Sequence, residues 1–198
     1  MGVSASRAET VPVDPAELLD GFFRNVERMP GATALTRGPE TLTYAQLGDK
    51  VLAVAAALQS RGVLAGEHVA LVCPESADRI PALIAIVTAG AACLPIGADQ
   101  PNARTRALLH GSGVEFALVT GDSWPDVLDD CGVPALTVAD AEIVGDPALF
   151  EPVPTAPALH DGDASVAGML DTLSAGGAIV IEAHRHMRVI ETAAPRCR

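Results

Sequence analysis

The sequence predicts an α/β fold in which a mostly parallel sheet is flanked by helices. Apolar segments of strand length alternate with helical segments of about a dozen residues, the pattern of right-handed βαβ units. Hydrophobic residues make up 49% of the 198 residues, but aromatic residues make up only 3%. Alanine, valine, leucine and isoleucine must therefore fill the core, as they do where helices cover a buried parallel sheet.

The chain begins with a predicted helix and two short extended segments. Leucine, phenylalanine and valine recur at helical spacing over residues 15–28, and Pro30 and Gly31 end this pattern. Residues 32–36 and 41–44 are typical of extended segments, and a Gly-Pro-Glu turn separates them.

A second helix is predicted over residues 44–61. Thr43 stands three residues before Gln46, which is the spacing of a capping box at a helix start. Apolar residues then line one face of the helix as far as Gly62, where a helix would end. These residues are Leu47, Val51, Val54 and Leu58.

The remaining α/β pattern consists of short apolar strands and intervening helices. The predicted strands are residues 68–74, 92–97, 116–120 and 135–138, and the predicted helices are 75–89 and 104–112. A final pair of strands, 164–170 and 178–184, would close around a Ser-Ala-Gly-Gly turn. The predicted organisation is a flexible N-terminus (1–14), an α/β subdomain (15–144), a proline-rich connecting loop (145–163) and a last region with a C-terminal tail (164–198).

Charge and cysteine content limit the classes of function. The formal net charge of −12 opposes binding to nucleic acid or to an anionic membrane, so a small molecule or a protein is the expected partner. The first residues lack the apolar region of a signal peptide, and the longest apolar stretch is too short to span a bilayer. The four cysteines, Cys73, Cys93, Cys131 and Cys197, are widely spaced, which favours reduced thiols in a cytoplasmic protein.

Residues 171–187 could form a phosphate-binding loop. Ser174, Gly176 and Gly177 are small enough for backbone N–H groups to converge on an anion, and we take them as the candidate cofactor-binding residues. Such a loop also needs a cation, and the only lysine of the chain is Lys50, far upstream. Poor nucleotide binding is therefore expected.

Other polar groups are better explained as solvated side chains than as catalytic or metal sites. His184 and His186 lack a third metal ligand at suitable spacing, and Ser174 lacks both a GxSxG motif and a nearby base. The paired carboxylates Asp129–Asp130 and Asp161–Asp163 are expected by chance in so acidic a chain. We predict no catalytic residue and no metal site.

Two motifs resemble core motifs of nonribosomal peptide synthetase adenylation domains. LTYAQL (42–47) looks like the first core motif, and TAGAACLPI (88–96) looks like the second. These domains belong to the adenylate-forming ligases, together with acyl-CoA synthetases and luciferases. The resemblance runs over about residues 18–187 and implies the fold of the front part of such a domain, with Tyr44 and Gln46 in structural rather than catalytic roles.

The chain departs from the family pattern at the phosphate loop. The family's third core motif contains a lysine and more small residues, whereas the corresponding segment here is TLSAGG (172–177). DASVAGML (163–170) resembles the strand before that loop, and IVIEAHRHM (179–187) resembles the segment after it. The resemblance also implies that the amino-acid pocket, the adenine and ribose contacts and the catalytic lysine would lie beyond residue 198.

These features lead to a main functional hypothesis and two alternatives. The main hypothesis is a truncated adenylation-like protein of bacterial nonribosomal peptide (antibiotic) biosynthesis, non-catalytic alone and without a cofactor, which is either an interaction or scaffold module or a relic. Its partner would be a peptide synthetase or a second copy of the chain. The first alternative is half of a split ligase that uses ATP and Mg²⁺ with a partner chain to activate an amino or aryl acid. The second alternative is a small-ligand binding domain.

Overall fold

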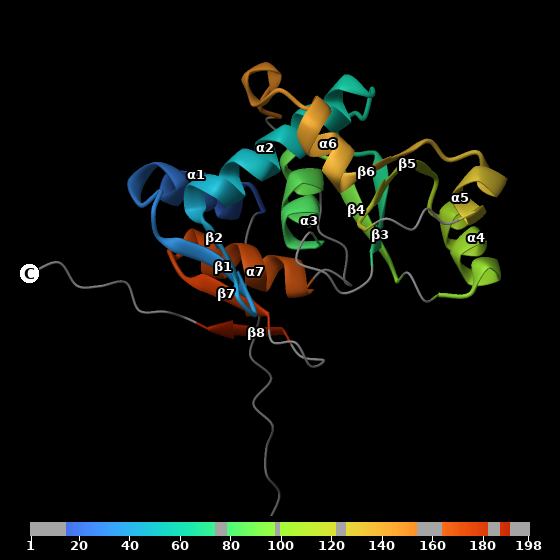
Figure 1. The fold of residues 1–198 in the computed structure, drawn as a ribbon. Helices are drawn as coiled ribbons and strands as arrows, with labels where there is room; N and C mark the ends of the chain where they lie inside the picture. The colour runs from blue at the N-terminus through green and yellow to red at the C-terminus, as the bar shows by residue number, and fades with distance from the viewer. Residues whose placement is uncertain are drawn as a thin grey trace, which may run out of the picture.

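The computed structural model describes residues 15–73, 79–97, 100–121, 126–153, 164–181 and 187–190. Its elements are α1 (Pro15–Arg28), β1 (Thr33–Arg37), β2 (Glu40–Thr43), α2 (Tyr44–Ser60), β3 (His68–Cys73), α3 (Arg79–Thr88), β4 (Ala92–Gly97), α4 (Asn102–Gly111), β5 (Val114–Val119), α5 (Asp126–Cys131), β6 (Ala135–Thr137), α6 (Val138–Val144), the 3-10 helix η1 (Pro147–Leu149), α7 (Ala164–Ser174), β7 (Ala178–Ile181) and β8 (Met187–Ile190). In Figure 1 the sheet of β1, β2, β7 and β8 lies on the left and the sheet of β3 to β6 lies right of centre, with α3 between them and α2 above α3.

The larger part of the α/β pattern forms a parallel sheet, as predicted. Its strand order is β4-β3-β5-β6, and each neighbouring pair is parallel. In β3 every residue after His68 is buried, which is typical of a central parallel strand covered on both faces. The predicted fold class is therefore confirmed.

The second sheet joins the two ends of the described chain. Its order is β2-β1-β7-β8, with β1 antiparallel to β2 but parallel to β7. Leu35 of β1 lies opposite Ile179 of β7, so residues from the two ends of the sequence are neighbours. The sequence pattern did not predict this pairing, because it depends on contacts between distant segments.

The capping box at the start of α2 is present. The Thr43 hydroxyl accepts a hydrogen bond from the Gln46 N–H at 3.3 Å, and the Thr43 N–H donates to Gln46 Oε1 at 2.9 Å. These two bonds satisfy N–H groups that the helix itself leaves free. The prediction that Gln46 is a structural residue is confirmed.

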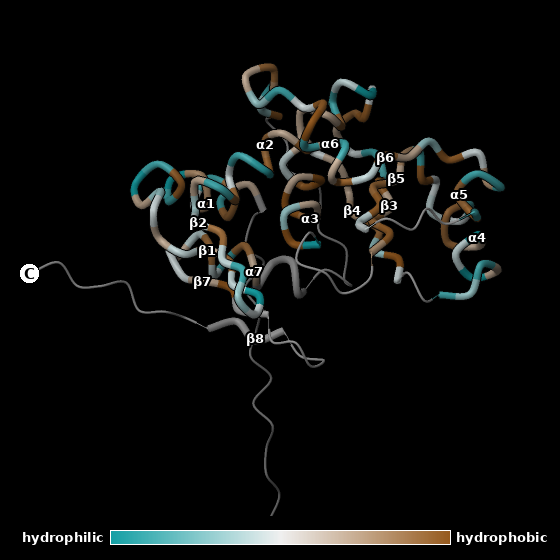
Figure 2. Tube along the Cα trace, viewed as in Figure 1, coloured by the Kyte–Doolittle hydropathy of each residue, from teal (hydrophilic) through white to brown (hydrophobic). Residues whose placement is uncertain are grey.

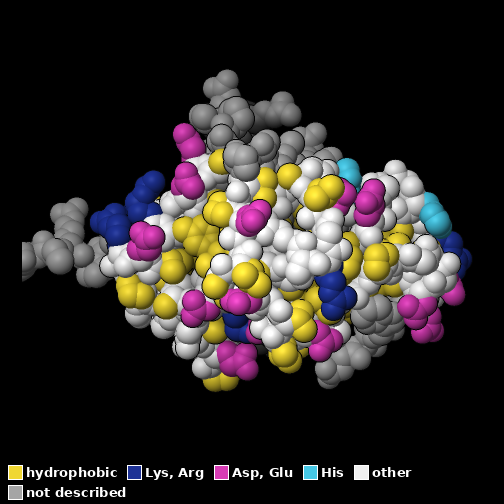
Figure 3. Space-filling view, turned by 90° about the horizontal axis from the view of Figure 1, so that it is seen from above, with side chains coloured by type: hydrophobic (Ala, Val, Ile, Leu, Met, Phe, Trp, Pro, Cys, Tyr) yellow, Lys and Arg dark blue, Asp and Glu magenta, His cyan; other side chains and the backbone are white. Residues whose placement is uncertain are grey.

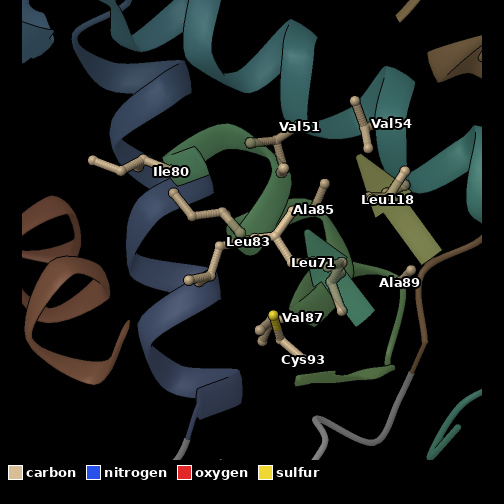
Figure 4. Close-up of a cluster of buried hydrophobic side chains, with 14 of the residues drawn as sticks. Val51, Val54, Leu71, Ile80, Leu83, Ala85, Val87, Ala89, Cys93 and Leu118 are labelled. Carbon is tan, nitrogen blue, oxygen red and sulfur yellow. The ribbon is translucent and has the colours of Figure 1, made fainter. Parts of the chain in front are cut away.

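The core lies where α2 and α3 pack on β3 and β5. Figure 4 shows Val51 and Val54 of α2 facing Leu83 of α3, Leu71 of β3 and Leu118 of β5, and all five are buried. In Figure 2 the hydrophobic segments of α3 and β3 lie in the interior of the molecule. Burying one such aliphatic side chain contributes about 1.5–3 kcal/mol, so this cluster is a main source of stability.

One predicted element is wrong. Residues 164–170 were expected to form a strand, but Ala164–Ser174 is the helix α7, which packs against α1. Met169, Leu170 and Leu173 are buried and Asp171 is exposed, which is helical rather than alternating spacing. A short apolar run is compatible with a strand or a helix. Here packing against α1 favours the helix.

Candidate functional site

The predicted phosphate-loop residues lie together at the C-terminal end of α7. Ser174 is the last residue of the helix, Gly176 lies in the turn that follows, and Gly177 leads into β7. Gly176 has a φ of +83°, which L-residues with a side chain rarely adopt. The turn is a glycine-containing helix end of the kind that reverses the chain after a last helical turn.

The backbone N–H groups of this turn donate to carbonyl groups of α7. The N–H of Ala175 donates to the Asp171 carbonyl at 3.0 Å, and the N–H of Gly176 donates to the Leu173 carbonyl at 3.2 Å. The N–H of Gly177 donates to the Thr172 carbonyl at 2.9 Å. These three donors are therefore taken up inside the chain.

The Ser174 side chain and the helix dipole both disfavour binding of an anion at this turn. The Ser174 hydroxyl donates to the Asp171 carbonyl at 2.9 Å. The turn follows the C-terminal end of a helix, where the macrodipole is negative, whereas phosphate sites use the positive N-terminal end. Phosphate binding by Ser174, Gly176 and Gly177 stays a prediction, and the turn that contains them is built from groups with internal partners.

Asn25 of α1 holds the end of α7 from one side. Its side-chain amide donates to the Leu173 carbonyl at 2.9 Å and to the Ser174 carbonyl at 2.7 Å. Asn25 is only 5% exposed; its bond to Leu173 is buried and its bond to Ser174 is partly buried. The last carbonyl groups of a helix lack donors within the helix, and the Asn25 amide donates to two of them here. Sequence reasoning missed this role; the available signal was a polar residue on the apolar face of α1.

Tyr44, the first residue of α2, holds the same turn from another side. Its hydroxyl lies 3.0 Å from the Leu173 carbonyl oxygen and 2.6 Å from the Gly177 carbonyl oxygen, and the side chain is fully buried. The single hydroxyl proton is shared between these two acceptors. Burial raises the pKa of Tyr44 to about 12, so the hydroxyl remains a donor at neutral pH. The predicted structural role of Tyr44 is confirmed.

Glycine lets α1 approach α7 closely enough for these bonds. A Cβ at Gly21 would lie 2.5 Å from the Ser174 Cβ, closer than side-chain atoms can pack. A Cβ at Gly176 would lie 2.9 Å from the terminal methyl of Met29. The end of α7 and its turn are therefore enclosed by α1 and by Met29, which follows it, as well as hydrogen-bonded to α1.

The other candidate residues lie elsewhere in the molecule or outside the described part. Lys50 forms an ion pair with Glu142, which joins α2 to α6, and Asp130 pairs with Arg106 at 2.8 Å. His184, His186, Asp161 and Asp163 lie outside the described residues. Within the described ranges, no group of three or more histidine, cysteine, aspartate or glutamate side chains could hold a metal ion. In the same ranges, no helix combines the length and hydropathy needed to cross a bilayer.

Residues 22–164 match the family described as AMP-binding enzyme. Phenyloxazoline synthase MbtB from Mycobacterium sp. (strain MCS) is 47% identical over 141 residues, which is 68% of this chain but 12% of that protein. The chain therefore spans about an eighth of the length of this relative. The family match ends ten residues before Ser174, so the turn after α7 lies beyond it.

Solved structures of the nonribosomal peptide synthetase FmoA3 share the fold. One FmoA3 structure superposes with a TM-score of 0.71 at 24% identity, covering 86% of this chain and 23% of that one. The form described as bound to alpha-methyl-L-serine-AMP superposes with a TM-score of 0.62 at 28% identity, covering 72% of this chain and 16% of that one. The sheets and helices described above are therefore those of the front part of an adenylation domain.

Proposed function

The chain belongs to the AMP-binding enzyme family, and from this premise we propose that it is an adenylation-domain-like module of nonribosomal peptide biosynthesis that does not form adenylates alone. It acts as an interaction or scaffold module for a protein partner. The relative MbtB is by name a phenyloxazoline synthase, and a pathway that makes peptide-derived natural products fits this likeness.

The observation that carries this proposal is the hydrogen bonding of the turn after α7. A nucleotide phosphate needs free N–H donors and a nearby cation. The N–H groups of Ala175, Gly176 and Gly177 donate to carbonyls of α7, and Lys50 pairs with Glu142 on α6. The residues of this turn therefore do not fit a triphosphate or its Mg²⁺ ion.

The buried bonds from Asn25 and Tyr44 make this arrangement costly to change. Freeing the N–H groups of the turn would require the end of α7 to unwind, which would leave the carbonyls of Leu173 and Ser174 without their present donors. Each buried polar group left without a partner costs about 1–3 kcal/mol. Such a rearrangement would weaken nucleotide binding by the same amount.

The alternative function is half of a split ligase, which family membership itself favours. A partner chain would then supply the phosphate-binding and catalytic groups, and the two chains together would activate an amino or aryl acid with ATP. The likeness to the FmoA3 form described as bound to an aminoacyl-AMP supports this alternative.

Amino-acid- and aryl-acid-dependent exchange of pyrophosphate into ATP tests the two functions. We expect no exchange above background with the purified chain alone, with an intact adenylation domain as the positive control. Exchange by the chain alone would contradict the proposed function. Exchange only after addition of a protein encoded beside this chain would establish the split ligase instead.

A further inference from the structure

Four large hydrophobic side chains are exposed in the described part of the chain. They are Leu64 (65% exposed), Ile143 (80%), Val144 (53%) and Leu149 (74%). Single exposed leucines are common, but a cluster of them on a small domain marks a site of interaction. Three of the four, Leu64, Val144 and Leu149, line one groove.

This groove lies between the end of α2 and the segment that follows α6. Its volume is about 440 Å³. Val63 and Leu64 form one wall, and Val144, Leu149 and Val153 form the other. α6 lies on the upper side of Figure 1, so Figure 3 looks down on this surface, where hydrophobic and acidic side chains lie next to one another.

A pair of hydrogen bonds between Gln59 and Glu151 holds the second wall in place. The Gln59 amide donates to the Glu151 carbonyl at 2.8 Å, and the Glu151 N–H donates to Gln59 Oε1 at 3.1 Å. This wall begins at Gly145, whose backbone packs directly against α2. The contact requires glycine, since a Cβ there would lie 1.8 Å from the Ala53 carbonyl oxygen. The groove is therefore formed before any partner arrives, which lowers the entropic cost of binding.

The uncharged polar side chains of the groove are bonded within the chain. The groove therefore presents aliphatic surface and negative charge to a partner. Both functional atoms of the Gln59 amide are bonded to Glu151, and the Ser60 hydroxyl donates to the Ala57 carbonyl. The charged side chains among the lining residues are Asp146 and Glu151, and both are acidic and exposed. A small polar ligand would find few donors or acceptors to orient it.

We propose that this groove docks a segment of a partner polypeptide that carries aliphatic side chains beside an arginine or lysine. The aliphatic side chains pack against Leu64, Val144 and Leu149, and the cation lies near Asp146 and Glu151. A second copy of the chain would bring an equally acidic surface to this one, at a net charge of −12 per copy, so a basic partner is favoured. The inference rests on the proposed interaction role and gives it a surface.

The probe is a fluorescein-labelled synthetic helical peptide with leucines along one face and arginines beside them. A peptide of the same composition in scrambled order is its control. We expect saturable binding of the patterned peptide in fluorescence anisotropy, and the scrambled peptide should bind at least tenfold more weakly. The double variant L64S/L149S should lose at least tenfold in affinity, since tenfold corresponds to about 1.4 kcal/mol and two aliphatic contacts are removed.

Two double variants that each remove two carboxylates test whether binding needs the negative charge of the groove. D146N/E151Q should weaken binding and reduce its salt dependence, whereas E40Q/E115Q removes two exposed carboxylates that do not line the groove and should change it far less. Equal effects of the two double variants, or undiminished binding by L64S/L149S, would overturn the proposal. The melting temperature of each variant confirms that it is folded.

Two further results bear on the occupant. A dimer in sedimentation velocity that L64S/L149S abolishes would make a second copy the occupant and overturn the proposal. Absence of saturable peptide binding up to millimolar concentration would also overturn it. Pyrophosphate exchange by the same samples reports on the proposed function separately, because exchange by the chain alone would contradict that function whatever the peptide does.

Discussion

The hydroxyl of Tyr44 lies 2.6 Å from the carbonyl oxygen of Gly177, across 133 positions of sequence. The tyrosine of the first core motif thus fixes the turn at which a phosphate loop was expected. Asn25 binds the preceding carbonyls of the same turn, so that α1, α2 and α7 meet at one buried polar cluster.

Titration of Tyr44 should destabilise the protein at high pH. Burial raises the pKa of Tyr44 from 10.0 to about 12. Below pH 10 the phenol is protonated in both states and its contribution to stability is constant. Between pH 10 and 12 the unfolded state loses the proton first, so the free energy of unfolding should fall by about 2–3 kcal/mol.

The near-ultraviolet absorbance of the phenolate measures this titration directly, because Tyr44 is the only tyrosine of the chain. The midpoint should lie near pH 12 in the folded protein and near pH 10 in concentrated urea. Y44F should lack the phenolate signal and show a smaller loss of stability over the same range. A midpoint near 10 in the folded protein would contradict the buried contacts of this hydroxyl.

Two substitutions of Asn25 should lower the free energy of unfolding for different reasons: N25A removes a hydrogen-bond donor, and N25D introduces a repulsive acceptor. N25A removes the amide that binds Leu173 and Ser174 and should cost about 1–3 kcal/mol. N25D keeps the size of the side chain but places a carboxylate against two carbonyl oxygens, so at pH 7 it should cost more. Urea denaturation measures both values. If N25D proves as stable as wild type, the amide does not act as the donor that caps α7.

Gly145 should tolerate no side chain, although its φ of −78° suits any residue. A Cβ there would lie 1.8 Å from the Ala53 carbonyl oxygen, so G145A must shift backbone and should cost about 1–3 kcal/mol. G31A is the matched control, because a Cβ at Gly31 meets nothing within 4 Å. Thermal unfolding compares the two variants. Equal melting temperatures would mean that α6 does not pack on α2 as described.

ATP with Mg²⁺ should leave the melting temperature unchanged. A ligand stabilises the folded state by an amount that grows with the ratio of its concentration to its dissociation constant, so a shift appears only if the site binds. The N–H groups of Gly176 and Gly177 are already used within α7, and we therefore expect no saturable shift in differential scanning fluorimetry. A saturable shift that S174A reduces would show that the turn binds phosphate, contrary to the proposed function.

The sequence predicted the elements whose hydrogen bonds and packing are local. Thr43 and Gln46 are three residues apart, so the capping box of α2 could be recognised without knowledge of the fold. β3 is a continuous apolar run and was predicted as a strand for that reason. The helix α7 was misassigned as a strand, because the short run 164–170 fits either period and its neighbour α1 decided between them.

The sequence located the candidate turn but could not predict its hydrogen-bond partners. The sequence alone determined that Ser174, Gly176 and Gly177 lie within one small-residue segment, that Lys50 is far from it along the chain, and that two motifs resemble those of adenylation domains. Only the tertiary structure decided that the turn follows a helix and that its N–H groups bond to α7. It also decided that Asn25 and Tyr44 cap this helix. The physical reason is that local spacing sets which residues can share an element, whereas the partners of buried polar groups depend on which elements pack together.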